Sequence, residues 1–151
     1  MTESKVSEGL LAARAFGSNK IGLVDLRGRW VIRPQFADAH EFHEGLAAFR
    51  TSALGKVGFI DRRGRVVIKP RFGTHFRVPP TFSEGLAAVG LNDLWPRSNL
   101  DPPGKLGYID RHGRWALAPL YAAGTSFKQG RAQVPLNGRE IELLAPEQSQ
   151  K

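Results

Sequence analysis

The sequence GFIDRRGRVVIKP at residues 58–70 decides the fold, because it carries the signature of a β-hairpin. Two short runs of β-branched and aromatic residues bracket a turn that begins at Asp61 and ends at Gly64. Asp at the first position of a type I turn accepts hydrogen bonds from the backbone of the turn, and the closing Gly takes the positive φ of a G1 bulge. Pro70 cannot donate to a sheet ladder, so we expect the second strand to end there.

This phrase occurs three times with unchanged internal spacing. The other copies are GLVDLRGRWVIRP at residues 22–34 and GYIDRHGRWALAP at residues 107–119. Their turn residues and closing prolines are Asp25, Gly28 and Pro34, and Asp110, Gly113 and Pro119. The sequence therefore predicts three hairpins of one kind.

A second phrase, typified by HEGLAAF at residues 43–49, alternates with the first. Its copies lie at residues 7–10, 43–49, 83–89 and 128–134, and their glycines are 36, 40 and 45 positions apart. Each copy predicts a third strand, with small Ala side chains where another layer can approach closely. Every unit is therefore predicted to form a three-stranded antiparallel meander.

The two phrases divide one predicted domain, residues 6–145, into repeat units. Three full units at residues 6–41, 42–81 and 82–126 precede a partial capping unit at 127–145, and residues 1–5 and 146–151 are expected to be flexible. Asn137-Gly138 in the capping unit predicts a hairpin with alternating Glu and apolar residues. Because a short unit cannot bury an apolar face alone, we expect an all-β fold, a stacked or partly closed array of meanders.

Two aromatic residues per unit occupy fixed offsets and are candidates for the core. One follows each proline and the other precedes each Glu-Gly phrase. They are Phe36, Phe72 and Tyr121, and Phe42, Phe82 and Phe127.

The combination of both phrases resembles the bacterial WG-repeat (KWG repeat) family, over residues 6–134. One departure is that the Trp that usually precedes the first Gly is replaced by Ile21, Val57 and Leu106. The resemblance implies a β-rich repeat module that has no common enzymatic activity and serves as an interaction element. It does not carry over any ligand role of the missing Trp.

Length and composition limit the classes of protein that the chain can represent. With 151 residues and no cysteine, it fits one domain without a disulfide framework or a cysteine-ligated metal. It has neither the apolar region of a signal peptide nor a run near the ~18 apolar residues of a spanning helix. We therefore expect a cytoplasmic protein with no membrane partner.

Positive charge is concentrated in the middle of the chain. The formal net charge is +8, from 22 Lys plus Arg and 14 Asp plus Glu. Between residues 50 and 77, Asp61 is the single acidic residue, and the basic residues are Arg50, Lys56, Arg62, Arg63, Arg65, Lys69, Arg71 and Arg77. Such a field attracts acidic proteins, nucleic acid or anionic surfaces. A solvated face that keeps the chain soluble explains it equally well.

The residues do not suggest an enzyme. His40 and His43 lie beside Asp38, Glu41 and Glu44, but two imidazoles fit a solvated loop between units better than a zinc site. The repeated Asp residues are explained by turn chemistry, and neither a nucleophile elbow nor a phosphate-binding loop is present in the sequence. We therefore predict no catalytic residue, no metal and no cofactor.

Two insertions interrupt the regular spacing and are the preferred places for a binding site. The segment near residues 74–80 is four residues longer than its counterparts, and the segment at residues 90–104 is nine residues longer. Loops on one face of a repeat array commonly bind partners, and aromatic residues beside Arg are typical of interface hot spots. The predicted partner-binding residues are Trp95, Arg97, Phe76, Arg77, Arg62 and Arg63. The alternative for Trp95 is to cover the core of the third unit.

The leading functional hypothesis is a non-enzymatic protein-binding module with an acidic protein partner. Its most specific form is an immunity protein or antitoxin that neutralises a toxin by occluding it. The alternative is nucleic-acid binding through the basic patch Arg50 to Arg77, in which case affinity would fall steeply with salt. A hydrolase built from Asp and His residues of different units ranks third. The oligomeric state stays open, because Glu140 and Glu142 blunt an edge that could otherwise pair.

Overall fold

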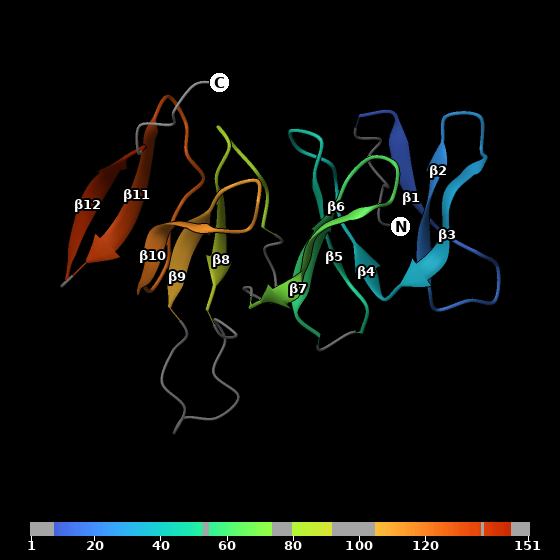
Figure 1. Cartoon of the computed structure of the whole chain (residues 1–151), viewed down its shortest axis with the longest axis horizontal. Helices are drawn as coiled ribbons and strands as arrows, with labels where there is room; N and C mark the ends of the chain where they lie inside the picture. Colours follow the sequence, from blue (N-terminus) through green and yellow to red (C-terminus); the bar gives the residue numbers. More distant parts are fainter. Residues whose placement is uncertain (1–7, 53–54, 74–79, 92–104, 137, 146–151) are drawn as a thin grey trace. The chain divides into compact units, whose positions relative to one another are not determined.

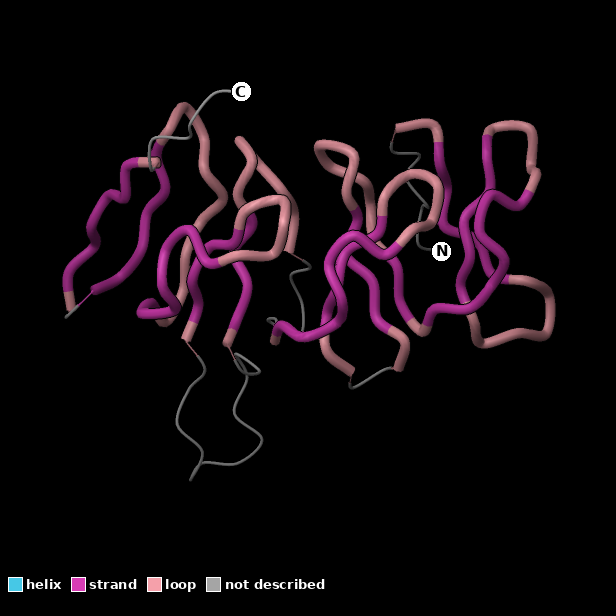
Figure 2. The backbone as a smooth tube through the Cα atoms, viewed as in Figure 1, coloured by secondary structure: helices cyan, strands magenta, loops and turns pink. Residues whose placement is uncertain are grey.

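The fold is all-β and built from antiparallel strands (Figure 1). The computed structural model describes residues 8–52, 55–73, 80–91, 105–136 and 138–145. These residues form twelve strands and no helix, so no helix in this part of the chain could cross a membrane. The tube in Figure 2 shows short strands joined by turns and loops throughout.

The strands form four small sheets, none of which closes into a barrel. The first sheet has the order β1-β2-β3, with β1 Leu10–Arg14, β2 Ile21–Asp25 and β3 Trp30–Phe36. The second has the order β4-β5-β6-β7, with β4 Asp38–Ala39, β5 Ala47–Arg50, β6 Val57–Ile60 and β7 Val66–Phe72. The third has the order β10-β9-β8, with β8 Ala87–Gly90, β9 Leu106–Ile109 and β10 Trp115–Tyr121. The last pairs β11 Arg131–Leu136 with β12 Arg139–Leu144.

This arrangement confirms the predicted meanders. In each of the first three sheets a strand from the Glu-Gly phrase pairs with the first strand of a hairpin, and that strand pairs with the second. The predicted capping hairpin is present as β11 and β12. Its predicted turn residue Asn137 lies outside the described residues.

The chain divides into two compact bodies, which we call the N-terminal body, Met1–Phe72, and the C-terminal body, Gly73–Lys151. The N-terminal body contains a core cluster that runs from Leu10 to Ile60, and the C-terminal body contains one that runs from Leu86 to Val134. All six aromatic residues predicted for the core are buried, at 8% exposure or less. Phe36 packs on Phe49, and Tyr108 packs edge-on against Phe127, with ring centroids 5.0 and 4.9 Å apart.

The three hairpin turns have the predicted geometry. In each turn the Asp backbone oxygen accepts a hydrogen bond of 3.0 Å from the Gly amide. Each Asp Oδ1 also accepts hydrogen bonds from two backbone amides, at 2.8–3.0 Å. The glycines have φ between 78° and 85°, the region that disfavours any side chain. The Asp and Gly of the Asp-x-x-Gly sequence therefore determine the backbone conformation of the turn.

The expectation that each proline ends its strand is wrong. Strands β3, β7 and β10 continue two residues beyond the proline, because the prolines sit in β-bulges, where no ladder hydrogen bond is needed from them. The glycine that opens each copy of the phrase faces the bulge. A Cβ added at Gly22, Gly58 or Gly107 would lie 2.7 Å from the proline nitrogen. The bulge therefore explains why these glycines recur.

The Glu-Gly phrase forms a two-residue turn and also ties neighbouring repeats together. Both central residues have positive φ, for example 54° at Glu84 and 79° at Gly85, which is the type I′ hairpin turn. The Glu8 carboxylate accepts a hydrogen bond from the Gly45 amide at 3.1 Å. The Glu84 carboxylate likewise accepts one from the Gly130 amide at 2.9 Å. The glutamate of one repeat thus anchors the turn of the next.

Candidate interaction surface

The turn between β6 and β7 presents three arginines on a rigid backbone. Asp61 Oδ1 accepts hydrogen bonds of 2.9 Å from the amides of Arg63 and Arg65, and Gly64 has a φ of 85°. The side chains of Arg62, Arg63 and Arg65 are exposed. We call this turn, residues 61–65, the arginine turn.

The arginine turn differs from its two counterparts at its last arginine, because Arg65 forms no ion pair with the turn Asp among the described residues. Arg29 Nε donates to Asp25 Oδ2 at 3.1 Å, and Arg114 Nε donates to Asp110 Oδ2 at 3.2 Å. Within the described residues, Arg62, Arg63 and Arg65 form no such ion pair with Asp61 or another carboxylate. Their charges are therefore available to a partner.

The counterpart carboxyls have lowered pKa values. At Asp25 the main cause is the hydrogen bond from the Arg29 amide, which lowers the pKa below 3.8. At Asp110 partial burial acts in the opposite direction, but hydrogen bonds from the Arg114 and His112 amides outweigh it, and the pKa is again lowered. Both carboxylates are thus ionised at neutral pH and accept the hydrogen bonds of the turn.

The arginine turn packs against the preceding repeat within the N-terminal body. A Cβ added at Gly64 would lie 2.6 Å from the Cδ1 atom of Ile32, which belongs to β3. Gly28, in the same position of the first hairpin, has nothing within 4 Å. The turn of the second repeat is therefore seated on the edge strand of the first.

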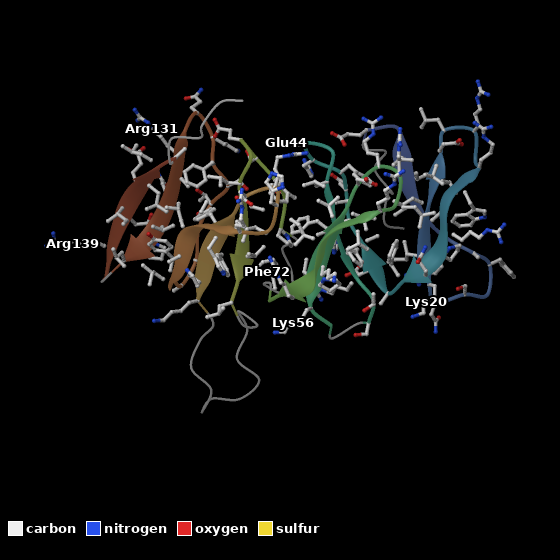
Figure 3. The ribbon with its side chains drawn as sticks, viewed as in Figure 1. Lys20, Glu44, Lys56, Phe72, Arg131 and Arg139 are labelled. Carbon is white, nitrogen blue, oxygen red and sulfur yellow. The ribbon has the colours of Figure 1, made fainter. Side chains whose placement is uncertain are left out.

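Apolar side chains are exposed at the starts of both second strands of this body. Trp30 and Val31 on β3 are 42% and 39% exposed, and Val66 and Val67 on β7 are 51% and 43% exposed. The hairpin turns lie at the upper side of Figure 3, whereas Lys20 and Lys56 project from the lower side of the same body. Positive charge thus occurs both on the side of the hairpin turns and on the side of Lys20 and Lys56. The exposed Trp30 belongs to the side of the turns, because it directly follows the turn at residues 25–29.

The predicted basic patch is less continuous than the sequence suggests. The Arg50 side chain is half-buried and its Nε has no hydrogen-bond partner in the described structure. Arg71 lies over the ring of Phe72, 5.0 Å from its centroid. Arg62 and Arg63, which were predicted to bind a partner, have exposed side chains. The other predicted binding residues, Trp95, Arg97, Phe76 and Arg77, lie outside the described residues.

The neighbouring histidines each lie beside one carboxylate. His40 Nε2 lies 3.3 Å from Asp38 Oδ2, and His43 Nε2 lies 3.7 Å from Glu41 Oε2. The hydrogen bond with His40 is the main reason why the pKa of Asp38 is lowered. Among the described residues, no group of three His, Cys, Asp or Glu could hold a metal ion. Part of this segment is strand β4, which covers the edge of β5.

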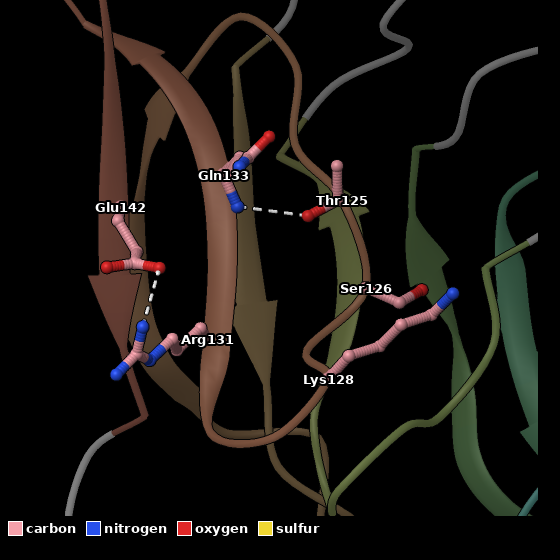
Figure 4. Close-up of a pocket in the computed structure, with 6 residues that line it drawn as sticks. All are labelled: Thr125, Ser126, Lys128, Arg131, Gln133 and Glu142. Atoms are coloured by element: carbon pink, nitrogen blue, oxygen red, sulfur yellow. Dashed lines mark hydrogen bonds and ion pairs between the residues drawn. The ribbon is translucent and has the colours of Figure 1, made fainter.

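A polar hollow of about 420 Å³ lies in the C-terminal body (Figure 4). Its lining residues are Thr125, Ser126, Lys128, Arg131, Gln133 and Glu142. Two of the lining side chains already have partners within the hollow. Arg131 pairs with Glu142 at 3.6 Å, and the Thr125 hydroxyl accepts a hydrogen bond from the backbone amide of Gln133 at 2.9 Å. Most of the lining is exposed, so the hollow could not enclose a small molecule.

Sequence reasoning missed Trp30 and Val66 as candidate binding residues, and it named Arg65 only as part of the basic patch Arg50 to Arg77. They belong to the regular repeat, whereas the prediction favoured the irregular insertions. The sequence also carries no signal that Arg65 is unpaired, because Arg29 and Arg114 occupy the same repeat position and pair with the turn Asp.

Comparison with known proteins supports the repeat architecture and gives its family. No curated protein and no solved structure matches the chain. The family model described as the WG containing repeat matches residues 21–52, 58–95 and 107–139. These segments cover more than half of the chain, and each contains one hairpin phrase together with the Glu-Gly phrase or its counterpart that follows. The chain therefore belongs to the WG-containing repeat family.

Proposed function

We propose that this chain is a non-enzymatic binding module that engages an acidic protein through the arginine turn. The observation that supports this proposal is the set of three exposed guanidinium groups, Arg62, Arg63 and Arg65, for which the described structure provides no carboxylate. The planar guanidinium group can form two parallel hydrogen bonds with one carboxylate, so it loses less side-chain freedom per hydrogen bond than a lysine does. An acidic surface is therefore the natural complement of this turn.

One specific version of this function is an immunity protein or antitoxin of the cytoplasm. A small repeat scaffold with a basic face can cover the acidic active site of a toxin by charge complementarity, without chemistry of its own. If the partner is a toxin, equimolar addition of the chain should abolish the toxin's activity in vitro.

A capture experiment with matched charge variants tests the proposal. Tagged wild-type chain is incubated with nuclease-treated lysate of its source cells at about 0.15 M salt. The wild type and the control Arg14→Glu/Lys20→Glu should retain the same near-stoichiometric protein, because Arg14 and Lys20 are exposed but lie away from the turn. Arg62→Glu/Arg63→Glu, with the same change in net charge, should lose it. Equal retention by both variants would contradict the assignment of the arginine turn.

Nucleic-acid binding is the second candidate, and Trp30 beside unpaired arginines is the observation in its favour. Single-strand binders stack successive bases on several exposed aromatic rings. The aromatic residues predicted for the core are instead buried. A salt titration with single-stranded DNA and RNA separates the two candidates, because phosphate contacts give a steep loss of affinity with salt.

A further inference from the structure

The exposed apolar residues beside the arginine turn form a second feature of the same surface. Trp30 lies two residues before Ile32 on β3, and Val66 lies two residues after Gly64. Since two residues of extended chain span about 7 Å, both side chains emerge close to the contact between Gly64 and Ile32. One partner of ordinary interface size, about 800 Å² on each side, could cover the apolar residues and the arginines together.

We infer that the partner's binding segment is apolar as well as acidic, with aliphatic or aromatic side chains placed between its carboxylates. This inference rests on the proposed function and names the chemistry of the partner. The carboxylates would pair with Arg62, Arg63 and Arg65, and the apolar side chains would cover Trp30, Val31, Val66 and Val67. We call these seven residues the mixed surface. Trp and Arg at the centre of a contact are the residue types that contribute most to binding.

The mode of binding is contact between side chains rather than addition of a strand. A strand can add to a sheet edge only where the edge offers a regular row of backbone donors and acceptors. Strands β3 and β7 are edge strands, but each carries two register irregularities and a proline. Their edges are therefore poor templates, and their exposed side chains are what a partner can read.

The test is a selection from a randomised library of 12-residue peptides displayed on phage, with the purified full chain as bait. The mixed surface should enrich peptides in which acidic residues are interleaved with aliphatic or aromatic ones. The best enriched peptide is then synthesised, and its affinity is measured by calorimetry at several temperatures. Binding should show a negative heat-capacity change, because apolar surface is buried.

Two matched tryptophan variants locate the contact. Trp30→Ser should lower the affinity of the chain for the selected peptide at least tenfold, the effect expected of a hot-spot residue. Trp115→Ser changes the residue at the same repeat position of the C-terminal body and should leave the affinity within about twofold. Circular dichroism shows whether each variant keeps the wild-type fold, and Val66→Ser gives a second, smaller change on the same surface.

The outcomes separate this inference from the proposed function. If the enriched peptides are acidic without apolar residues, or if Trp30→Ser and Val66→Ser both bind like wild type, the mixed surface is wrong while the acidic partner stands. If no acidic peptides are enriched, and the arginine variant also retains the protein captured from lysate, both proposals fail.

Discussion

At the scale of single residues, the glycine that opens each hairpin phrase is the most constrained position. It has no unusual φ, so the constraint comes from space, because a Cβ at Gly58 would lie 2.7 Å from the nitrogen of Pro70. The proline bulge on one strand and the glycine on its neighbour therefore form one structural unit. The proline bulge needs a residue without a Cβ on the neighbouring strand, and the glycine is required at its position because of the bulge.

We predict that Gly58→Ala destabilises the protein by about 3 kcal/mol, the upper range for overpacking a site with no room. Gly17→Ala is the control, since Gly17 has a φ of 80° but nothing within 4 Å of an added Cβ. It should cost only about 1 kcal/mol, the strain of a left-handed alanine. Urea unfolding measures both variants, and equal losses would show that the bulge tolerates a methyl group.

Acid sensitivity is also set by single residues. Asp25 and Asp110 have pKa values lowered from 3.8, so their ionised forms stabilise the fold above that pH. That contribution is lost as the pH falls through their lower folded pKa values. We expect Asp25→Asn/Asp110→Asn to keep the turn hydrogen bonds and to flatten the decline of the melting temperature below about pH 4. Some decline of the melting temperature should remain in the variant, because it keeps Asp38, whose pKa is also lowered. A wild-type slope in the variant would contradict this prediction.

At the scale of strands and turns, the glutamate that anchors the next repeat is the main new feature. Glu8 has a φ of 51° and its carboxylate reaches the Gly45 amide at 3.1 Å. Gln129 has the same backbone, with a φ of 52°, but no hydrogen-bond partner for its side chain among the described residues. The same turn thus has a linking role in one repeat and none in another.

This pair gives a matched test of the link. Glu8→Ala should lower the free energy of unfolding by about 1 kcal/mol, the typical value of a lost hydrogen bond. Gln129→Ala should change it by a few tenths at most, because both variants place alanine at the same φ and only the first removes a contact. Chemical unfolding of the two variants compares them directly. A loss of the same size in both would assign the effect to the backbone.

The sequence predicted the elements well because their signals are local. The Asp-x-x-Gly turns, the strand after each Glu-Gly phrase and the buried aromatic residues all follow from spacing within one repeat. The run of each second strand past its proline did not follow, since Pro70 is accommodated by Gly58 on the neighbouring strand. The contact of Gly64 with Ile32 and the anchor from Glu8 to Gly45 were missed for another reason. These two contacts join different repeats, and spacing within one repeat carries no information on them, whereas the proline bulge lies within one repeat but depends on how its two strands pair.

The candidate site was predicted only in part. Arg62 and Arg63 were recognised by charge, which is visible in the sequence. The exposure of Trp30 was not, because Trp is highly buried on average in proteins, whereas this position is exposed in two repeats, at 42% for Trp30 and 36% for Trp115. Whether an arginine is paired or free also depends on three-dimensional contacts, as Arg29 and Arg65 show.

At the scale of the whole molecule, the free arginines add to an excess of positive charge. The chain carries a formal net charge of +8, and charges of one sign repel one another in the folded state. Among the described residues, the guanidinium groups of Arg62, Arg63 and Arg65 form no ion pair that offsets that repulsion, whereas Arg29 pairs with Asp25 at 3.1 Å. Residues that serve binding commonly reduce stability in this way.

We therefore expect Arg62→Gln/Arg63→Gln/Arg65→Gln to keep or raise the melting temperature at about 0.02 M salt, where screening is weak. At about 0.3 M salt the variant and the wild type should melt together, because salt already screens the repulsion. Arg29→Gln is the control, and it should lower the melting temperature slightly, since it removes an exposed ion pair. Scanning calorimetry at both salt concentrations gives the comparison. A triple variant that is less stable at both would show that these arginines hold the fold together, and the arginine turn would lose its standing as a binding surface.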